Sequence, residues 1–99
     1  MAPAPGDALS PADAAALDAL RRRFVDRLPQ RWRDIEQAAD ADARVTALHR
    51  LAGAAGAFGL AELGHAARVA HDLAERGGGP PLDAALAELR RLLETAGRA

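Results

Sequence analysis

Apolar side chains recur at every third or fourth position along most of the chain, which is the spacing of amphipathic helices. The first such stripe comprises Leu17, Leu20, Phe24, Leu28, Trp32 and Ile35. Ser10, Pro11 and Asp13 supply a capping hydroxyl, a first-turn proline and an acid near the helix start. Pro29 interrupts the stripe without changing its phase, so we expect one helix over about 10–39 with a kink or break near Pro29.

The same spacing predicts three further helices, over about 43–58, 61–75 and 82–96. Asp40 and Asp42 flank a short turn that can cap the first of these, and Gly59 can close it in a left-handed conformation. The run from Gly77 to Pro81 is the clearest break in the chain. No segment alternates between apolar and polar residues as a half-buried strand would.

These elements predict an all-α protein. We expect an antiparallel, up-and-down four-helix bundle over residues 10–99, after a short flexible N-terminal segment at residues 1–9 that holds two prolines and a glycine. A chain of 99 residues is one small domain. Apolar residues make up 49% of it, but many are alanine, so each leucine is needed for the core.

Composition and charge exclude several classes of function. The chain has no cysteine, which excludes a disulfide framework, a cysteine zinc site and thiol catalysis, and suits a reducing compartment. Its net charge is −1, with acids and bases interspersed, so nucleic acid is not expected as the main partner. No apolar run could span a membrane and no signal peptide is evident, so we expect a cytoplasmic protein. Met1 and the lead-in suggest an independent protein.

The predicted helix at 43–58 has a bare face around one histidine. Its core face consists of Leu48, Leu51, Ala55 and Phe58. At about 100° per residue, His49 lies roughly 140° from the centre of that face, which predicts an exposed imidazole. Its neighbours on the helical wheel are Ala52, Gly53 and Gly56, so few side-chain atoms surround it.

Two explanations fit the glycines beside His49. Gly53 and Gly56 either allow close packing between helices or leave room for another molecule to approach the imidazole. A neutral imidazole is a nucleophile, and phosphoryl groups are among the electrophiles it accepts. Phosphoryl transfer also needs its charge neutralised, usually by Mg²⁺. The sequence places no carboxylate cluster around His49, so a partner would have to hold that metal ion.

The same segment resembles a known family. Histidine-containing phosphotransfer (Hpt) domains carry a pattern of the type H-x-L-K-G, with another glycine six residues after the first. Here the chain reads H-R-L-A-G from His49 to Gly53, and Gly59 stands at the expected position. Residues 63–75 also look like the family's next helix, so the resemblance extends over about residues 10–97.

The resemblance implies a phosphorelay carrier rather than an enzyme. His49 would accept a phosphoryl group from the aspartate of a receiver domain or from a hybrid histidine kinase, and would pass it to another receiver. The partner receiver would supply the acidic pocket and Mg²⁺, so the chain needs no cofactor or metal site of its own. The partner-docking residues would be Arg50, Ala52, Gly53 and Gly56. We expect the carrier to be a monomer.

One position departs from the family pattern. Ala52 stands where the family usually has a lysine, three residues after the histidine. A lysine there would neutralise phosphate oxygens, whereas Arg50 reaches His49 only by curling back along the helix. A degenerate domain is therefore the alternative: a helical adaptor that binds a receiver or kinase without being phosphorylated.

Two further features have an ordinary explanation beside a functional one. Glu62 and His65 have the E-x-x-H spacing of metal sites in helical bundles, but the pair points outward, and His71 sits at the border of the apolar stripe of Leu63. We therefore interpret these residues as solvated helix surface, with a metal site that involves His65 and His71 as the alternative. The arginine-rich stretch at 21–33 is interpreted as a solvated face paired with acids. Docking of an acidic receiver surface on these arginines is the alternative.

Overall fold

Helices account for all the regular structure in residues 10–98, the part of the chain that the computed structural model describes. In chain order the helices are α1 (Pro11–Asp26), α2 (Leu28–Glu36), α3 (Ala41–Ala57), α4 (Ala61–Glu75) and α5 (Pro80–Arg98). The all-α prediction is confirmed for these residues. There are five helices in these residues rather than the predicted four, because the segment at 10–39 is divided into two helices at the predicted kink or break near Pro29. The predicted flexible segment at 1–9 lies outside the described residues.

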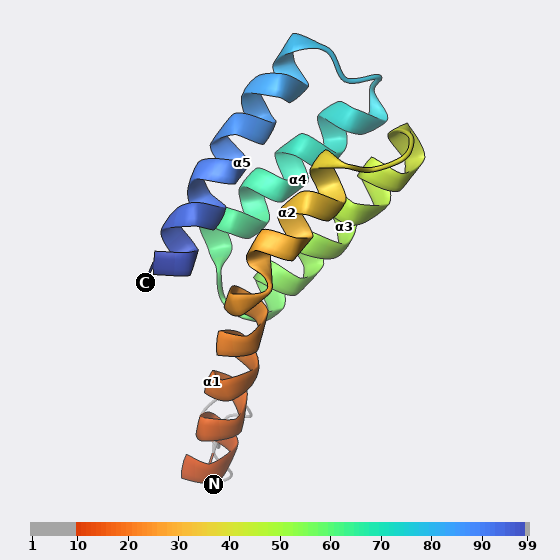
Figure 1. The fold of residues 1–99 in the computed structure, drawn as a ribbon. Helices are drawn as coiled ribbons and strands as arrows, with labels where there is room; N and C mark the ends of the chain where they lie inside the picture. Colours follow the sequence, from red (N-terminus) through yellow and green to blue (C-terminus); the bar gives the residue numbers. More distant parts are fainter. Residues whose placement is uncertain (1–9, 99) are drawn as a thin grey trace, which may run out of the picture.

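Four of the helices form a bundle. Contacts join α2 to α3, α3 to α4, α4 to α5, and α5 back to α2, so each bundle helix packs against two neighbours. Figure 1 shows the four lying side by side, with successive helices running in opposite directions. Within the described residues, no helix combines the length and hydropathy that a membrane span requires.

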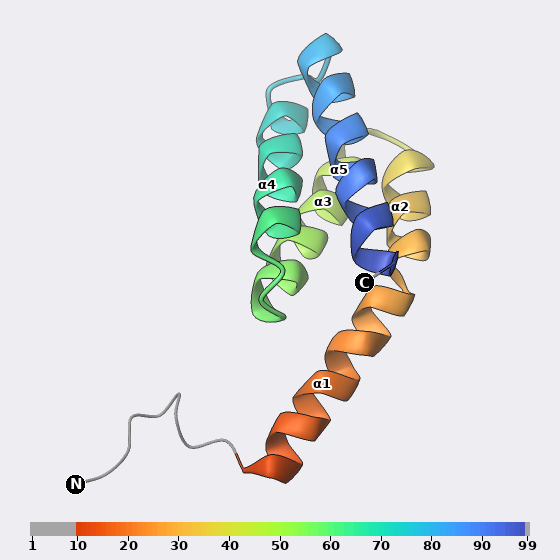
Figure 2. The ribbon, with the colours of Figure 1, turned by 90° about the vertical axis from the view of Figure 1, so that its left-hand side faces the viewer.

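The remaining helix, α1, is not one of the four bundle helices and extends beyond one end of the bundle (Figure 2). The chain breaks at Arg27, whose φ of −95° and ψ of 0° end α1 and precede α2. Pro29 explains the break, because it has no N–H to continue the hydrogen bonding of α1 and its ring would clash with the preceding turn. Leu17 and Leu20 of the predicted apolar stripe are 46% and 50% exposed, because the stripe continues past the end of the bundle.

The core lies between the four bundle helices and is made of leucine, isoleucine, phenylalanine and alanine. Its buried residues are Phe24, Leu28, Ile35, Leu48, Leu51, Ala52, Ala55, Leu63, Ala66, Ala67, Ala70, Leu82, Leu89 and Leu93. Phe58, which ends the apolar face of α3, is half-buried and stacks on Phe24 with ring centroids 5.2 Å apart. The α3 core face predicted from spacing is therefore confirmed.

Side-chain and glycine caps fix where the helices begin and end. The Ser10 hydroxyl accepts a hydrogen bond from the Asp13 N–H at 3.1 Å, and the Asp40 carboxylate accepts one from the Ala43 N–H at 2.7 Å. Asp40 thus starts α3 two residues earlier than predicted. The last helix also begins early, at Pro80, because the first-turn N–H groups of a helix have no partner within it and proline loses nothing there.

The turn between α3 and α4 is set by a left-handed glycine. Gly59 has a φ of +75°, as predicted. The Leu60 N–H donates to the Ala55 carbonyl at 2.9 Å, and the Gly59 N–H donates to the Gly56 carbonyl at 3.1 Å. This is the Schellman arrangement of hydrogen bonds, which ends a helix and reverses the chain. The two helices of the site described next are therefore joined by a tight, well-defined turn.

Candidate functional site

His49 lies on the outer surface of α3, in its third turn. Its neighbours in the chain differ sharply in burial: Leu48 is fully buried, whereas His49 and Arg50 are exposed. Within residues 10–98 the imidazole of His49 takes part in no hydrogen bond. The exposure predicted from the helical wheel is confirmed, and the ring nitrogens of His49 are accessible from outside the bundle.

The glycines beside His49 are not required by packing within the chain. A Cβ added to Gly53 or Gly56 would find no atom within 4 Å. The glycine that faces the neighbouring helix is Gly64, where a Cβ would lie 3.4 Å from the Gly56 nitrogen and 3.5 Å from the Ala52 carbonyl oxygen, in ordinary van der Waals contact. Of the two explanations, packing between helices therefore concerns Gly64, which the sequence interpretation did not single out. The side-chain space above Gly53 and Gly56 is open.

Ala52 does not lie on this open face. Only 8% of its surface is exposed, and it belongs to the buried cluster. Three residues after His49, the helix has turned toward α4, whose Gly64 lies against the backbone of Ala52 and Gly56. The helical wheel predicts Ala52 beside His49 on the bare face, but its side chain is buried in the core instead. Its methyl group presents little surface to a partner.

Arg50 lies on the other flank of α3, toward α2. It lines a groove between α2 and α3 together with Arg27, Gln30, Arg31, Asp34, Ala43, Thr46 and Ala47. This groove, which we call the basic groove, carries three arginines and one aspartate. His49 and Arg50 thus face different sides of α3, as their separation of about 100° on the wheel predicts.

A second histidine lies next to His49. The ring of His71, on α4, has its centroid 5.6 Å from that of His49, and the two ring planes are inclined by 47°. The His71 side chain is 18% exposed. His65 is exposed, as solvated surface would be, whereas His71 is partly buried, in agreement with its position at the border of the apolar stripe.

The position of the turn could have revealed this pair. His49 is ten residues before Gly59, and His71 is twelve residues after it. In an antiparallel helical hairpin, positions at similar distances on either side of the turn lie at the same level along the two helices. The wheel of each helix taken alone cannot show such a neighbour.

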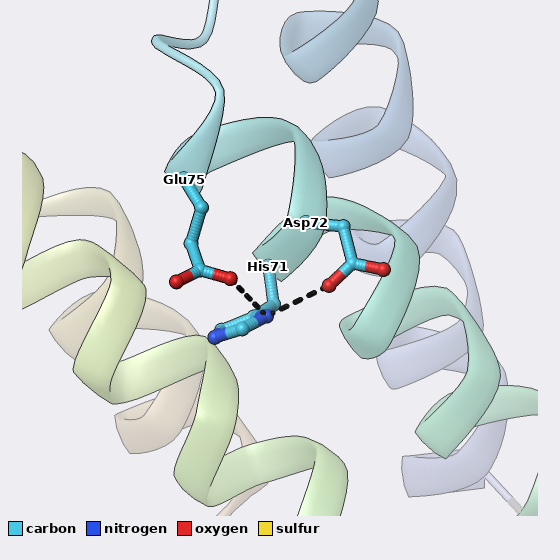
Figure 3. Close-up of side chains that lie close together, drawn as sticks. All are labelled: His71, Asp72 and Glu75. Carbon is cyan, nitrogen blue, oxygen red and sulfur yellow. Dashed lines mark hydrogen bonds and ion pairs between the residues drawn. The ribbon is translucent and has the colours of Figure 1, made fainter.

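Two carboxylates hold the His71 ring. Its Nδ1 atom lies 3.0 Å from an Asp72 oxygen and 3.5 Å from a Glu75 oxygen (Figure 3). These three side chains are also the one group in the described residues whose atoms are close enough to hold a metal ion, within 4.8 Å of one another. The predicted alternative pair, Glu62 and His65, forms no such group there. Because both carboxylates meet the same nitrogen, they are arranged to accept its hydrogen bond.

Comparison with protein families identifies the fold around this site. A family model of the Hpt domain matches residues 19–99, which is most of the chain. The match includes all of α2 to α5 and therefore every residue of the site described above. Searches of curated proteins and of solved structures found no match to the chain.

Proposed function

The chain belongs to the Hpt domain family, and we propose that it is a phosphorelay carrier whose phosphoryl-accepting residue is His49. Hpt domains take part in phosphotransfer in two-component signalling, as carriers rather than as classical enzymes. The observation that carries the assignment to His49 is local: an exposed imidazole stands beside two glycines above which side-chain space is open.

The chemistry requires little from this chain beyond presentation of the imidazole. A neutral ring nitrogen of His49 attacks phosphorus, the new N–P bond forms, and the P–O bond to the receiver's aspartate breaks. The aspartate leaves as a carboxylate with the bonding electrons. In-line attack needs the reacting atoms roughly 3 Å apart, which requires the receiver's surface to come close to α3. Gly53 and Gly56 provide that access.

Neutralisation of the phosphoryl charge is assigned mainly to the partner. The carboxylates of Asp72 and Glu75, on the neighbouring helix, are engaged with the His71 ring, so we assign Mg²⁺ to the acidic pocket of the receiver. The basic groove, on the flank of α3 that faces α2, favours an acidic partner surface through charge complementarity, with Arg50, Arg27 and Arg31 as its cations.

The second candidate function is a non-covalent adaptor. It is favoured by a single observation, the alanine at position 52 in place of the family's usual lysine. An adaptor would dock receivers or kinases on the same face, through Gly53 and Gly56, and would leave His49 unmodified.

Transfer from phosphorylated receivers distinguishes the two functions. A panel of Mg²⁺-loaded receiver domains carrying labelled phosphoryl groups is mixed with the native protein, with His49→Gln and with His65→Gln. A carrier acquires acid-labile label in the native protein and in His65→Gln, but not in His49→Gln. If no receiver labels the native protein while at least one binds it, the adaptor function is correct.

A further inference from the structure

The pair His49 and His71 suggests how this chain manages without the lysine. The two rings belong to different helices, and the centroid distance of 5.6 Å leaves their nearest edges close together. A phosphoryl group on His49 would add three oxygens beside a ring that already has a neighbour. Whether His71 can bind those oxygens depends on which of its ring nitrogens is directed toward them.

The contacts of His71 with the two carboxylates determine which of its ring nitrogens is directed toward α3, the helix of His49. An ionised carboxylate only accepts hydrogen bonds, so the tautomer of His71 that matches Asp72 and Glu75 is the one with its proton on Nδ1. Its second ring nitrogen, Nε2, is directed toward α3 (Figure 3). The ring is therefore held on its Nδ1 side, and its other nitrogen is directed toward the helix that carries His49.

The surrounding charges favour a second proton on this ring once His49 is phosphorylated. Two carboxylates lie on the Nδ1 side, and a phosphoryl group would bring about −1.5 to −2 charges to the other side. The remaining charged group nearby in the sequence of α4 is Arg68, one turn before His71. On α3, Arg44 donates to the Ile35 carbonyl at 3.2 Å and Arg50 lines the basic groove, so both are directed toward α2.

We propose that His71 binds the phosphoryl group on His49, as an imidazolium that donates from Nε2 to a phosphoryl oxygen while Asp72 and Glu75 accept from Nδ1. This inference rests on the proposed function of His49. His71 takes up one proton from water as the N–P bond forms, and gives it back when the phosphoryl group leaves. The positive charge that Ala52 does not supply thus comes from the neighbouring helix.

The pH dependence of phosphorylation tests this role without a partner protein. The probe is potassium phosphoramidate, a small phosphoryl donor, and the readout is the rate constant for forming phosphohistidine between about pH 5.5 and 9. His49 must be neutral to attack and His71 must be protonated to bind, so the native rate rises and then falls with pH. Phosphoramidate also reacts more slowly once its own nitrogen, the leaving group, loses its proton, so the rates are compared at equal concentrations of protonated donor. On that basis a merely structural role for His71 would produce no falling limb.

Substitutions of His71 separate the effect of its charge from the effect of its packing. His71→Ala should phosphorylate about tenfold more slowly at neutral pH and lose the falling limb, because a preorganised donor to the developing charge is gone. His71→Gln, which keeps a neutral donor, should retain part of the rate without the falling limb. His65→Ala, on the same helix, should match the native protein, and circular dichroism should show all three folded.

The outcomes also separate this inference from the proposed function. If the native protein is phosphorylated on His49 and His71→Ala has the native rate and pH profile, the role of His71 is overturned and the carrier function stands. If neither phosphoramidate nor any receiver phosphorylates His49 in the native protein, both fail. In the native protein, NMR should show the His71 ring becoming doubly protonated at pH 7.5 on phosphorylation, and an unchanged ring would overturn the inference.

Discussion

The imidazole of His49 on α3 and the imidazole of His71 on α4 lie with their centroids 5.6 Å apart, one exposed and the other held by two carboxylates. This relationship places a reactive ring next to an anchored one across the closest helix pair of the bundle. The exposed ring is available to a partner. The anchored ring cannot turn away without losing its hydrogen bond to Asp72 and its contact with Glu75.

The carboxylates beside His71 should set the pH range in which phosphorylation is fast. In the double variant Asp72→Asn, Glu75→Gln the proposed His71 imidazolium loses two neighbouring negative charges, so the falling limb of the rate profile should move to lower pH. Phosphoramidate kinetics measure the shift. Glu62→Gln, an exposed acid at the start of the same helix, is the control and should leave the profile in place. An unshifted limb in the double variant would show that the acids do not govern His71.

A large side chain at position 53 should block the receiver without disturbing the fold. Gly53→Arg places its side chain in open space, so stability should not fall, and replacing helical glycine should even gain up to about 1 kcal/mol. Transfer from a receiver should fall at least tenfold because the reacting atoms are kept apart. Gly97→Arg, on α5 and equally free of neighbours, is the matched control. Equal transfer rates in the two variants would contradict the docking geometry.

The left-handed turn should tolerate no side chain without cost. Gly59→Ala forces a Cβ into a φ of +75°, which costs roughly 1–2 kcal/mol of stability. Urea denaturation followed by circular dichroism measures the change. Gly97→Ala, within a helix, provides the contrast and should be neutral or slightly stabilising. A Gly59→Ala protein as stable as the native one would mean that the turn has another conformation.

Gly64 should control the spacing between the two histidines. Gly64→Ala places its Cβ 3.4–3.7 Å from α3, which is ordinary contact, so the variant should remain close to native stability. Gly64→Leu cannot fit there and should cost about 1–3 kcal/mol while pushing α4 away from α3. Denaturant unfolding measures the stability. The same Leu variant should lose the falling limb of the phosphorylation profile, since His71 moves away from His49.

Local signals predicted the helix ends and the exposed site well. The capping groups of Ser10 and Asp40, the left-handed Gly59 and the exposure of His49 all depend on residues within a few positions of one another, and the structure has each of them as expected. Such features are determined by backbone chemistry and by one helical wheel, which a sequence displays directly.

Features that depend on how the helices meet were predicted less well. The exposed Leu17 is in phase with the core stripe, and its exposure follows from where the bundle ends. The burial of Ala52 and the contact of His49 with His71 follow from the register between α3 and α4. Register is set by Gly64 and by the turn at Gly59 acting together, and neither residue reveals it alone.

The most direct test of the carrier function follows a phosphoryl group onto the protein and off again. Native protein is loaded from a phosphorylated receiver, separated from it, and mixed with a second, unphosphorylated receiver and Mg²⁺, while mass spectrometry locates the phosphoryl group. A carrier shows the group first on His49 and then on the aspartate of the second receiver. A group that never reaches His49, or that stays there with every receiver offered, would contradict the carrier function.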